Sequence, residues 1–179
     1  MNQRRVVVFI ACSIDGYIAG KNENLDFLSL VEVPGEDYGY NDFIQTVDTV
    51  ILGRKTYDKV LGFGVPFPHA ERKCYVISGT RTGSDQHVSF WNNSPAELIT
   101  YLQQQTGTDI FVDGGAQVIH SLLEEGLIDR LTISFIPHLL GDGIQLFNNG
   151  RPEQQMQLVQ SKSFPSGLVQ LTYEKSKPA

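Results

Sequence analysis

The chain has 179 residues, of which 41% are hydrophobic and 19% charged, and its formal net charge is −6. These proportions are typical of a globular protein with a sizeable core, and we expect one domain over residues 1–179. The acidic balance argues against a nucleic-acid-binding protein, and the apolar runs fall short of the roughly 20 residues that span a bilayer, so we expect neither nucleic-acid nor membrane partners.

Eight runs rich in β-branched and aromatic residues predict strands. They cover Arg5–Ser13, Thr49–Leu52, Lys73–Ser78, His87–Phe90, Asp109–Val112, Arg130–Ile136, Gln157–Phe164 and Leu168–Glu174. Helical spacing occurs at Asp42–Val47, after the helix start Ser94-Pro95-Ala96-Glu97, and at Gln117–Glu125. This alternation predicts an α/β fold with a mixed, mostly parallel sheet of about eight strands flanked by helices. Pro165-Ser166-Gly167 indicates an antiparallel C-terminal hairpin at one edge.

Three glycine turns follow predicted strands and are the strongest functional signals. At Gly114-Gly115 a strand passes directly into helical spacing, an arrangement that presents backbone N–H groups to a phosphate. Gly53 precedes Arg54, Lys55 and Thr56, which suit phosphate oxygens. Ser78-Gly79-Thr80-Arg81 repeats the pattern and suits a further phosphate, such as the 2′-phosphate of NADP. Taken alone, each segment could be an ordinary polar turn, but together they favour a nucleotide site at the carboxyl ends of the strands.

Other common site motifs are not found in the sequence. The glycine turns do not form G-x-G-x-x-G or a P-loop. The four histidines, His69, His87, His120 and His138, are scattered, so we expect no metal site. Cys12 and Cys74 lie in apolar runs without C-x-x-C spacing, so we expect buried, reduced thiols and a cytoplasmic protein.

Six segments in chain order resemble the motifs of one known superfamily. They are Ser13–Ala19 (S-x-D-G-x-I-A), Leu25–Leu28 (D-W-L), Asp48–Tyr57 (D-x-x-x-x-G-R-x-T-Y), Tyr75–Ser78 (the third strand), Val112–Gly115 (the double-glycine turn) and Pro137–Phe147 (P-x-L-L-G-x-G-x-x-L-F). Together they resemble the dihydrofolate reductase superfamily and, more closely, its RibD C-terminal-domain relatives. Phe27 stands in place of the usual Trp and Gln145 where proline is frequent. The arginine-rich folate clamp and a linked deaminase domain are not recognisable.

The resemblance implies a three-layer α/β/α, dihydrofolate reductase-like fold and an NADPH cofactor. Gly53, Arg54, Lys55 and Thr56 would contact phosphates, and Gly114, Gly115, Ala116 and Gln117 the pyrophosphate. Ser78, Thr80 and Arg81 would surround the 2′-phosphate, and Ala11 and Ile18 would flank the nicotinamide. It also implies a cis peptide bond between Gly114 and Gly115.

The same resemblance implies hydride transfer to a pyrimidine- or pteridine-like ring, as in 5-amino-6-(5-phosphoribosylamino)uracil reductases. Asp37, Glu36 and Asp15 are the alternative catalytic carboxylates, and Phe27, Tyr38 and Tyr40 the candidate substrate contacts. A homodimer is expected to form through the hairpin Gln157–Glu174. Dihydrofolate reductase activity and a non-catalytic NADPH-binding protein are the alternatives.

Overall fold

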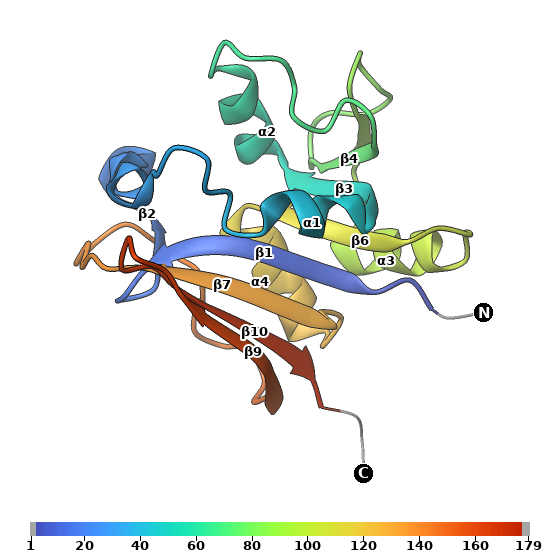
Figure 1. Ribbon diagram of the computed structural model, residues 1–179. Coiled ribbons are helices and arrows are strands. Elements are labelled where there is room, and N and C mark those ends of the chain that lie inside the picture. The colour runs from blue at the N-terminus through green and yellow to red at the C-terminus, as the bar shows by residue number, and fades with distance from the viewer. Residues whose placement is uncertain (1–2, 177–179) are drawn as a thin grey trace.

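The computed structural model describes residues 3–176, and an eight-stranded sheet lies at its centre (Figure 1). The strands are β1 (Val6–Ser13), β3 (Val47–Gly53), β4 (Lys73–Ile77), β5 (Ser89–Trp91), β6 (Asp109–Gly114), β7 (Arg130–Ile136), β9 (Met156–Ser163) and β10 (Val169–Lys175). Their order is β5-β4-β3-β6-β1-β7-β10-β9. The first six are parallel, and β10 and β9 add an antiparallel edge. Each predicted strand corresponds to one of these, which confirms the mixed sheet and the terminal hairpin.

The helices are α1 (Tyr40–Gln45), α2 (Arg54–Leu61), α3 (Pro95–Gln103) and α4 (Ala116–Glu124). The predicted N-cap of α3 is confirmed, because the Ser94 hydroxyl oxygen accepts a hydrogen bond from the Glu97 amide at 3.2 Å. Gly126 lies just beyond the C-cap of α4 with φ +61°, a conformation that glycine adopts without strain. The other predicted helix begins two residues early, at Tyr40.

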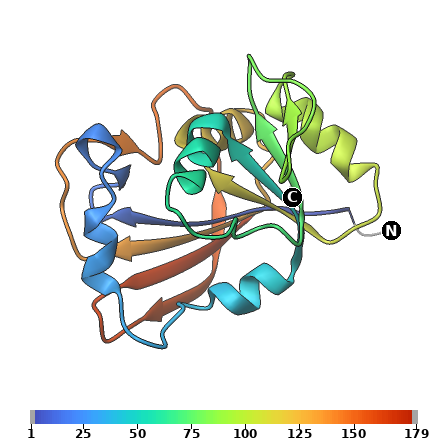
Figure 2. The ribbon, with the colours of Figure 1, turned by 90° about the horizontal axis from the view of Figure 1, so that it is seen from above.

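Alternate residues of the central strands face two separate cores, which accounts for the three layers. One core contains Val6, Ile51 and Val112 together with residues of α3 and α4. The other core contains Val7, Leu52 and Phe111 together with residues of α1 and α2. Figure 2 shows α1 and α3 on opposite sides of the sheet. The predicted three-layer α/β/α fold is therefore confirmed.

The strand predictions omit a small second sheet formed by β2 (Tyr17–Ala19) and β8 (Ile144–Gln145). The two strands pair antiparallel, and a Cβ atom at Gly143 would lie 2.1 Å from the Ala19 carbonyl oxygen. Glycine is needed at this position because the two backbones approach so closely. Two short 3₁₀ helices, η1 (Lys21–Glu23) and η2 (Asp26–Val31), follow β2.

Cys12 and Cys74 are free and buried, as predicted, and burial raises the pKa of each thiol to about 12. Within residues 3–176, no helix is long and apolar enough to cross a membrane.

Candidate functional site

A large cleft of about 1200 Å³ opens at the carboxyl ends of the parallel strands. The ends of β1, β3, β4 and β6 form its floor, and residues of α2, α4 and the β2–β8 loops form its walls. Strand β6 lies between β3 and β1, so the order of the strands along the sheet reverses at this point. An open α/β fold usually binds its ligand at such a reversal. Its lining includes most of the expected cofactor residues: Ala11, Ile18, Gly53, Arg54, Lys55, Thr56, Ser78, Gly114, Gly115, Ala116 and Gln117.

Three glycines and one hydroxyl form the middle of the cleft. The Gly114-Gly115 peptide bond is cis, which confirms that prediction, and Gly114 has φ +142°. A Cβ atom at Gly115 would lie 3.1 Å from the Thr56 hydroxyl oxygen, and one at Gly53 would lie 3.5 Å from the Gly115 amide nitrogen. A side chain at Gly115 would therefore crowd the junction between β3, α2 and β6, whereas the contacts at Gly53 are ordinary van der Waals ones. The bare backbone there leaves room for a ligand to approach closely.

Two helices begin at this junction, α2 after Gly53 and α4 after Gly115. Among the described residues, no side chain caps either N-terminus, whereas Ser94 caps α3. The first N–H groups of a helix lack intrahelical acceptors and carry partial positive charge. Two uncapped helix N-termini at one cleft form a suitable binding site for an anionic group such as a pyrophosphate.

Cations line the wall formed by α2. Lys59 donates a hydrogen bond to the Glu23 carbonyl, and the Lys55 Nζ atom lies 4.0 Å from a carboxylate oxygen of the same glutamate. Arg54 also lines the cleft and pairs with Asp58 at 3.0 Å. These groups place positive charge at the cleft of a protein that is acidic overall.

The third glycine turn lies at the end of β4. Ser78 is buried, and its hydroxyl oxygen accepts hydrogen bonds from the amides of Thr80 (3.3 Å) and Arg81 (3.0 Å). This serine therefore shapes the turn as well as lining the cleft. Thr80 and Arg81 are exposed and lie outside the set of lining residues. The Arg81 guanidinium instead pairs with Asp58 at 2.7 Å.

A second polar group lies at the end of the cleft formed by β1 and β6. Asp113 lines the cleft beside Phe9 and Ala11, and its Oδ2 atom is 3.0 Å from the Nε2 atom of His69. His69 is buried, and its Nδ1 atom has no hydrogen-bond partner among the described residues. That geometry favours the tautomer in which Nε2–H donates to Asp113. Reasoning from the sequence missed this pair, although Asp113 directly precedes the glycine turn.

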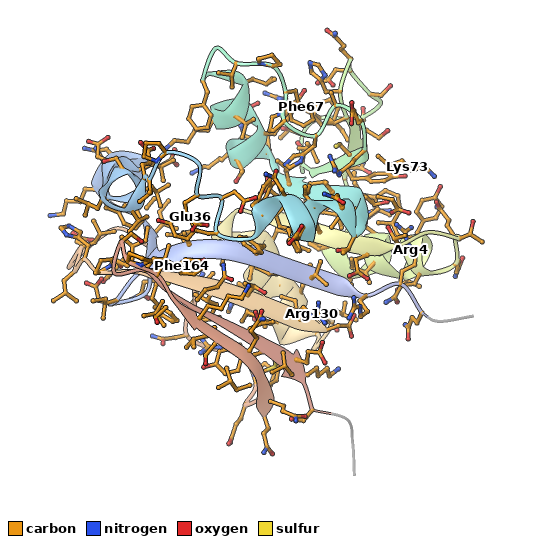
Figure 3. All side chains as sticks on the ribbon, in the orientation of Figure 1. Arg4, Glu36, Phe67, Lys73, Arg130 and Phe164 are labelled. Atoms are coloured by element: carbon orange, nitrogen blue, oxygen red, sulfur yellow. The ribbon has the colours of Figure 1, made fainter. Side chains whose placement is uncertain are left out.

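The described residues that line the cleft include none of the three expected catalytic carboxylates. The Asp37 carboxylate accepts hydrogen bonds from the Gly39 and Asn41 amides, at 2.9 and 3.0 Å, which lower its pKa. Glu36, on the loop before α1, accepts one from the Tyr38 amide at 2.8 Å (Figure 3). The Asp15 carboxylate accepts one from the Ser13 hydroxyl at 2.5 Å and others from Leu140 and Gly141. The structure gives all three carboxylates a role in holding loops.

None of the expected substrate aromatics is among the described residues that line the cleft. Phe27 is buried in a small core with Val31, Ile136 and Leu168. The Tyr38 hydroxyl hydrogen-bonds to the Val31 carbonyl and to Ser166, so this ring joins η2 to the C-terminal hairpin. Tyr40 packs edge-on against Phe9 with ring centroids 5.8 Å apart. Through Phe9, Tyr40 supports the cleft from beneath, and burial raises its pKa to about 12.

The family model of the RibD C-terminal domain matches residues 4–170. The chain belongs to the RibD C-terminal domain family. It is 40% identical over 172 residues to the uncharacterised protein YwjB of Bacillus subtilis, covering 96% of this chain and 98% of that protein.

Two solved structures extend the comparison. One is a candidate riboflavin biosynthesis protein from Shewanella sp. PV-4, with a TM-score of 0.89, 32% identity, and coverage of 97% of this chain and 99% of that one. The other is dihydrofolate reductase from Enterococcus faecalis complexed with NADP(H), with a TM-score of 0.66, 18% identity and 98% of both chains covered. The second likeness shows a shared fold, so the dihydrofolate reductase-like architecture is confirmed.

Proposed function

We propose that this protein is an NADPH-dependent reductase that transfers hydride to a pyrimidine- or pteridine-like ring, as a RibD-type reductase does. The observation that carries the proposal is the junction of Gly53, Gly114 and Gly115. There, two uncapped helix N-termini and the Thr56 hydroxyl meet at one cleft. Membership of the RibD C-terminal domain family and the likeness to an NADP(H)-bound fold support it.

The pyrophosphate of the cofactor would lie between the N-termini of α2 and α4, within reach of Lys55 and Thr56. The nicotinamide would extend toward Ala11 and Ile18, which line the same cleft. When bound, NADPH supplies a hydride, and the protein contributes orientation, charge and exclusion of water. The volume of about 1200 Å³ exceeds the roughly 300–1,000 Å³ of a drug-sized site, which allows room for a second molecule.

The substrate ring would lie beside Phe9, within reach of the Asp113 carboxylate. A pyrimidine or pterin presents N–H donors on its edge, and an ionised carboxylate accepts hydrogen bonds from such donors. His69 would orient Asp113 from beneath, and its single N–H leaves the second carboxylate oxygen free for the substrate. We therefore assign to Asp113 the substrate-site role for which Asp37, Glu36 and Asp15 were the candidates.

A substrate screen tests this function. Purified protein is mixed with NADPH and a panel of ribosylaminouracils, reducible pterins and dihydrofolate, and absorbance is followed at the NADPH band. Turnover of an aminouracil or a pterin supports the proposal. Turnover of dihydrofolate with tight methotrexate binding would make the protein a dihydrofolate reductase. NADPH binding without oxidation in any mixture would contradict the catalytic role.

A further inference from the structure

Asp58 is bonded to two arginines that come from different segments. Arg54 lies one turn earlier on α2, and its Nη1 atom is 3.0 Å from Asp58 Oδ2. Arg81 follows β4, and its Nη1 and Nη2 atoms are 2.7 and 3.2 Å from the two carboxylate oxygens. One carboxylate thus occupies donors of both guanidiniums at the rim of the cleft.

The three side chains are accessible to a ligand. Arg54, Asp58 and Arg81 are 41%, 35% and 42% exposed, so solvent screens their ion pairs and a competing anion can break them. Arg81 has other restraints, since its guanidinium lies 5.6 Å from the centroid of the Phe90 ring and its amide is fixed by Ser78. Arg81 therefore does not depend on Asp58 alone for its position.

We infer that Asp58 is a specificity-determining residue that competes with the 2′-phosphate of NADPH for Arg54 and Arg81. This inference rests on the proposed function. A phosphate monoester needs the N–H donors that Asp58 now occupies. It must displace the carboxylate or bind beside a like charge, and both cost binding free energy. NADH lacks that phosphate, so Asp58 does not oppose its binding. Asp58 therefore limits the preference for NADPH.

The test is Asp58→Asn, which keeps the size of the side chain and removes its charge. We expect NADPH to bind about fivefold more tightly than to wild type, with the NADH dissociation constant changed less than about twofold. Titrations followed by protein and dinucleotide fluorescence give both constants. Thermal melting of the variant establishes that α2 is intact.

Glu174→Gln is the matched control. It removes the same charge from an arginine–carboxylate pair, with Arg130 on β7 at 2.5 Å, at the amino end of the parallel strands (Figure 3). NADPH affinity should stay within about twofold of wild type in this control. A second comparison starts from the variant Arg81→Ala. Adding Asp58→Asn to it should give a smaller gain in NADPH affinity, because one of the two guanidiniums that Asp58 and the phosphate compete for is gone.

The possible results distinguish a failure of the proposed function from a failure of the proposed competition. Wild-type protein that binds no NADPH would refute the proposed function itself. Wild-type binding with an unchanged constant in Asp58→Asn would refute the competition. Weaker binding in Asp58→Asn would also refute it, because Asp58 would then position the arginines for the phosphate.

Discussion

The Asp113 carboxylate and the buried His69 imidazole lie 3.0 Å apart, which joins the floor of the cleft to the aromatic core beneath it. The His69 ring packs edge-on against Phe67 and Phe111, with ring centroids 5.7 and 6.1 Å away. A side chain fixed in this way holds its hydrogen-bond partner in one orientation, which is what a preorganised polar contact requires.

Asp113→Asn is therefore expected to lower kcat about 100-fold with the substrate that the screen identifies, because an amide replaces the carboxylate that would contact the ring. The NADPH dissociation constant should stay within about twofold, since the phosphates would bind elsewhere in the cleft. Steady-state kinetics and fluorescence titration measure the two effects separately. A variant with normal turnover would show that Asp113 has no part in the reaction.

Gly115→Ala tests the packing at the junction between β3, α2 and β6. The new Cβ atom would meet the Thr56 hydroxyl oxygen at 3.1 Å, so we expect a loss of about 1–3 kcal/mol in the free energy of unfolding. Thr56→Ala in the same chain removes the opposing oxygen and should recover part of that loss. Urea denaturation of the single and double variants measures the coupling. Strictly additive losses would contradict the close contact.

We expect the contribution of Asp15 to the stability of the fold to depend on pH. The hydrogen bond from Ser13, together with those from the Gly141 and Leu140 amides, lowers this pKa to about 2. The stabilisation is present above the unfolded value of about 3.9 and is lost as pH falls toward 2. Asp15→Asn should therefore lower the urea midpoint at pH 7 and lower it less near pH 2.5.

Asp26→Asn serves as the control for that experiment. Asp26 is the exposed first residue of η2, and its carboxylate accepts a hydrogen bond from the Asn24 side chain at 2.7 Å. Its effect on the urea midpoint should be small at both pH values. An equal loss for Asp15→Asn at pH 7 and pH 2.5 would contradict the assignment of the low pKa.

The outer edge of the main sheet supports the proposed dimer. Strand β9 is the last strand of the sheet, and Leu158 and Val159 on it are 50% and 45% exposed. An edge with exposed apolar side chains is suited to pairing with a second chain. We expect sedimentation equilibrium to give the mass of a dimer, and Leu158→Asp with Val159→Asp to give a monomer. A monomeric wild-type mass in dilute solution would contradict the dimer.

The sequence predicted the main sheet well because its central strands are apolar runs bounded by turn residues. The sequence could not predict β8, because that strand has only two residues. It could not predict the burial of Phe27 either, because this depends on where η2 packs against β7 and the hairpin. The glycine turns were recognisable because glycine has a local, backbone reason to be there.

The polar partners were not recognisable in the same way. Asp113 and His69 are 44 residues apart, and Asp58 and Arg81 are 23 apart, so each pair is defined only by the packing of the folded chain. Asp37 shows the converse, since the family resemblance made it a candidate catalytic carboxylate. Its carboxylate instead holds the first turn of α1 through the Gly39 and Asn41 amides.

Calorimetric titration of the wild-type protein and of Arg81→Ala with NADPH and with NADH tests the proposed cofactor site. We expect one NADPH site per chain, with NADH at least about tenfold weaker, and a loss of affinity in Arg81→Ala that falls mainly on NADPH. No heat of binding with either dinucleotide would contradict the assignment of the cleft. Equal losses for both in Arg81→Ala would contradict the role of the third glycine turn.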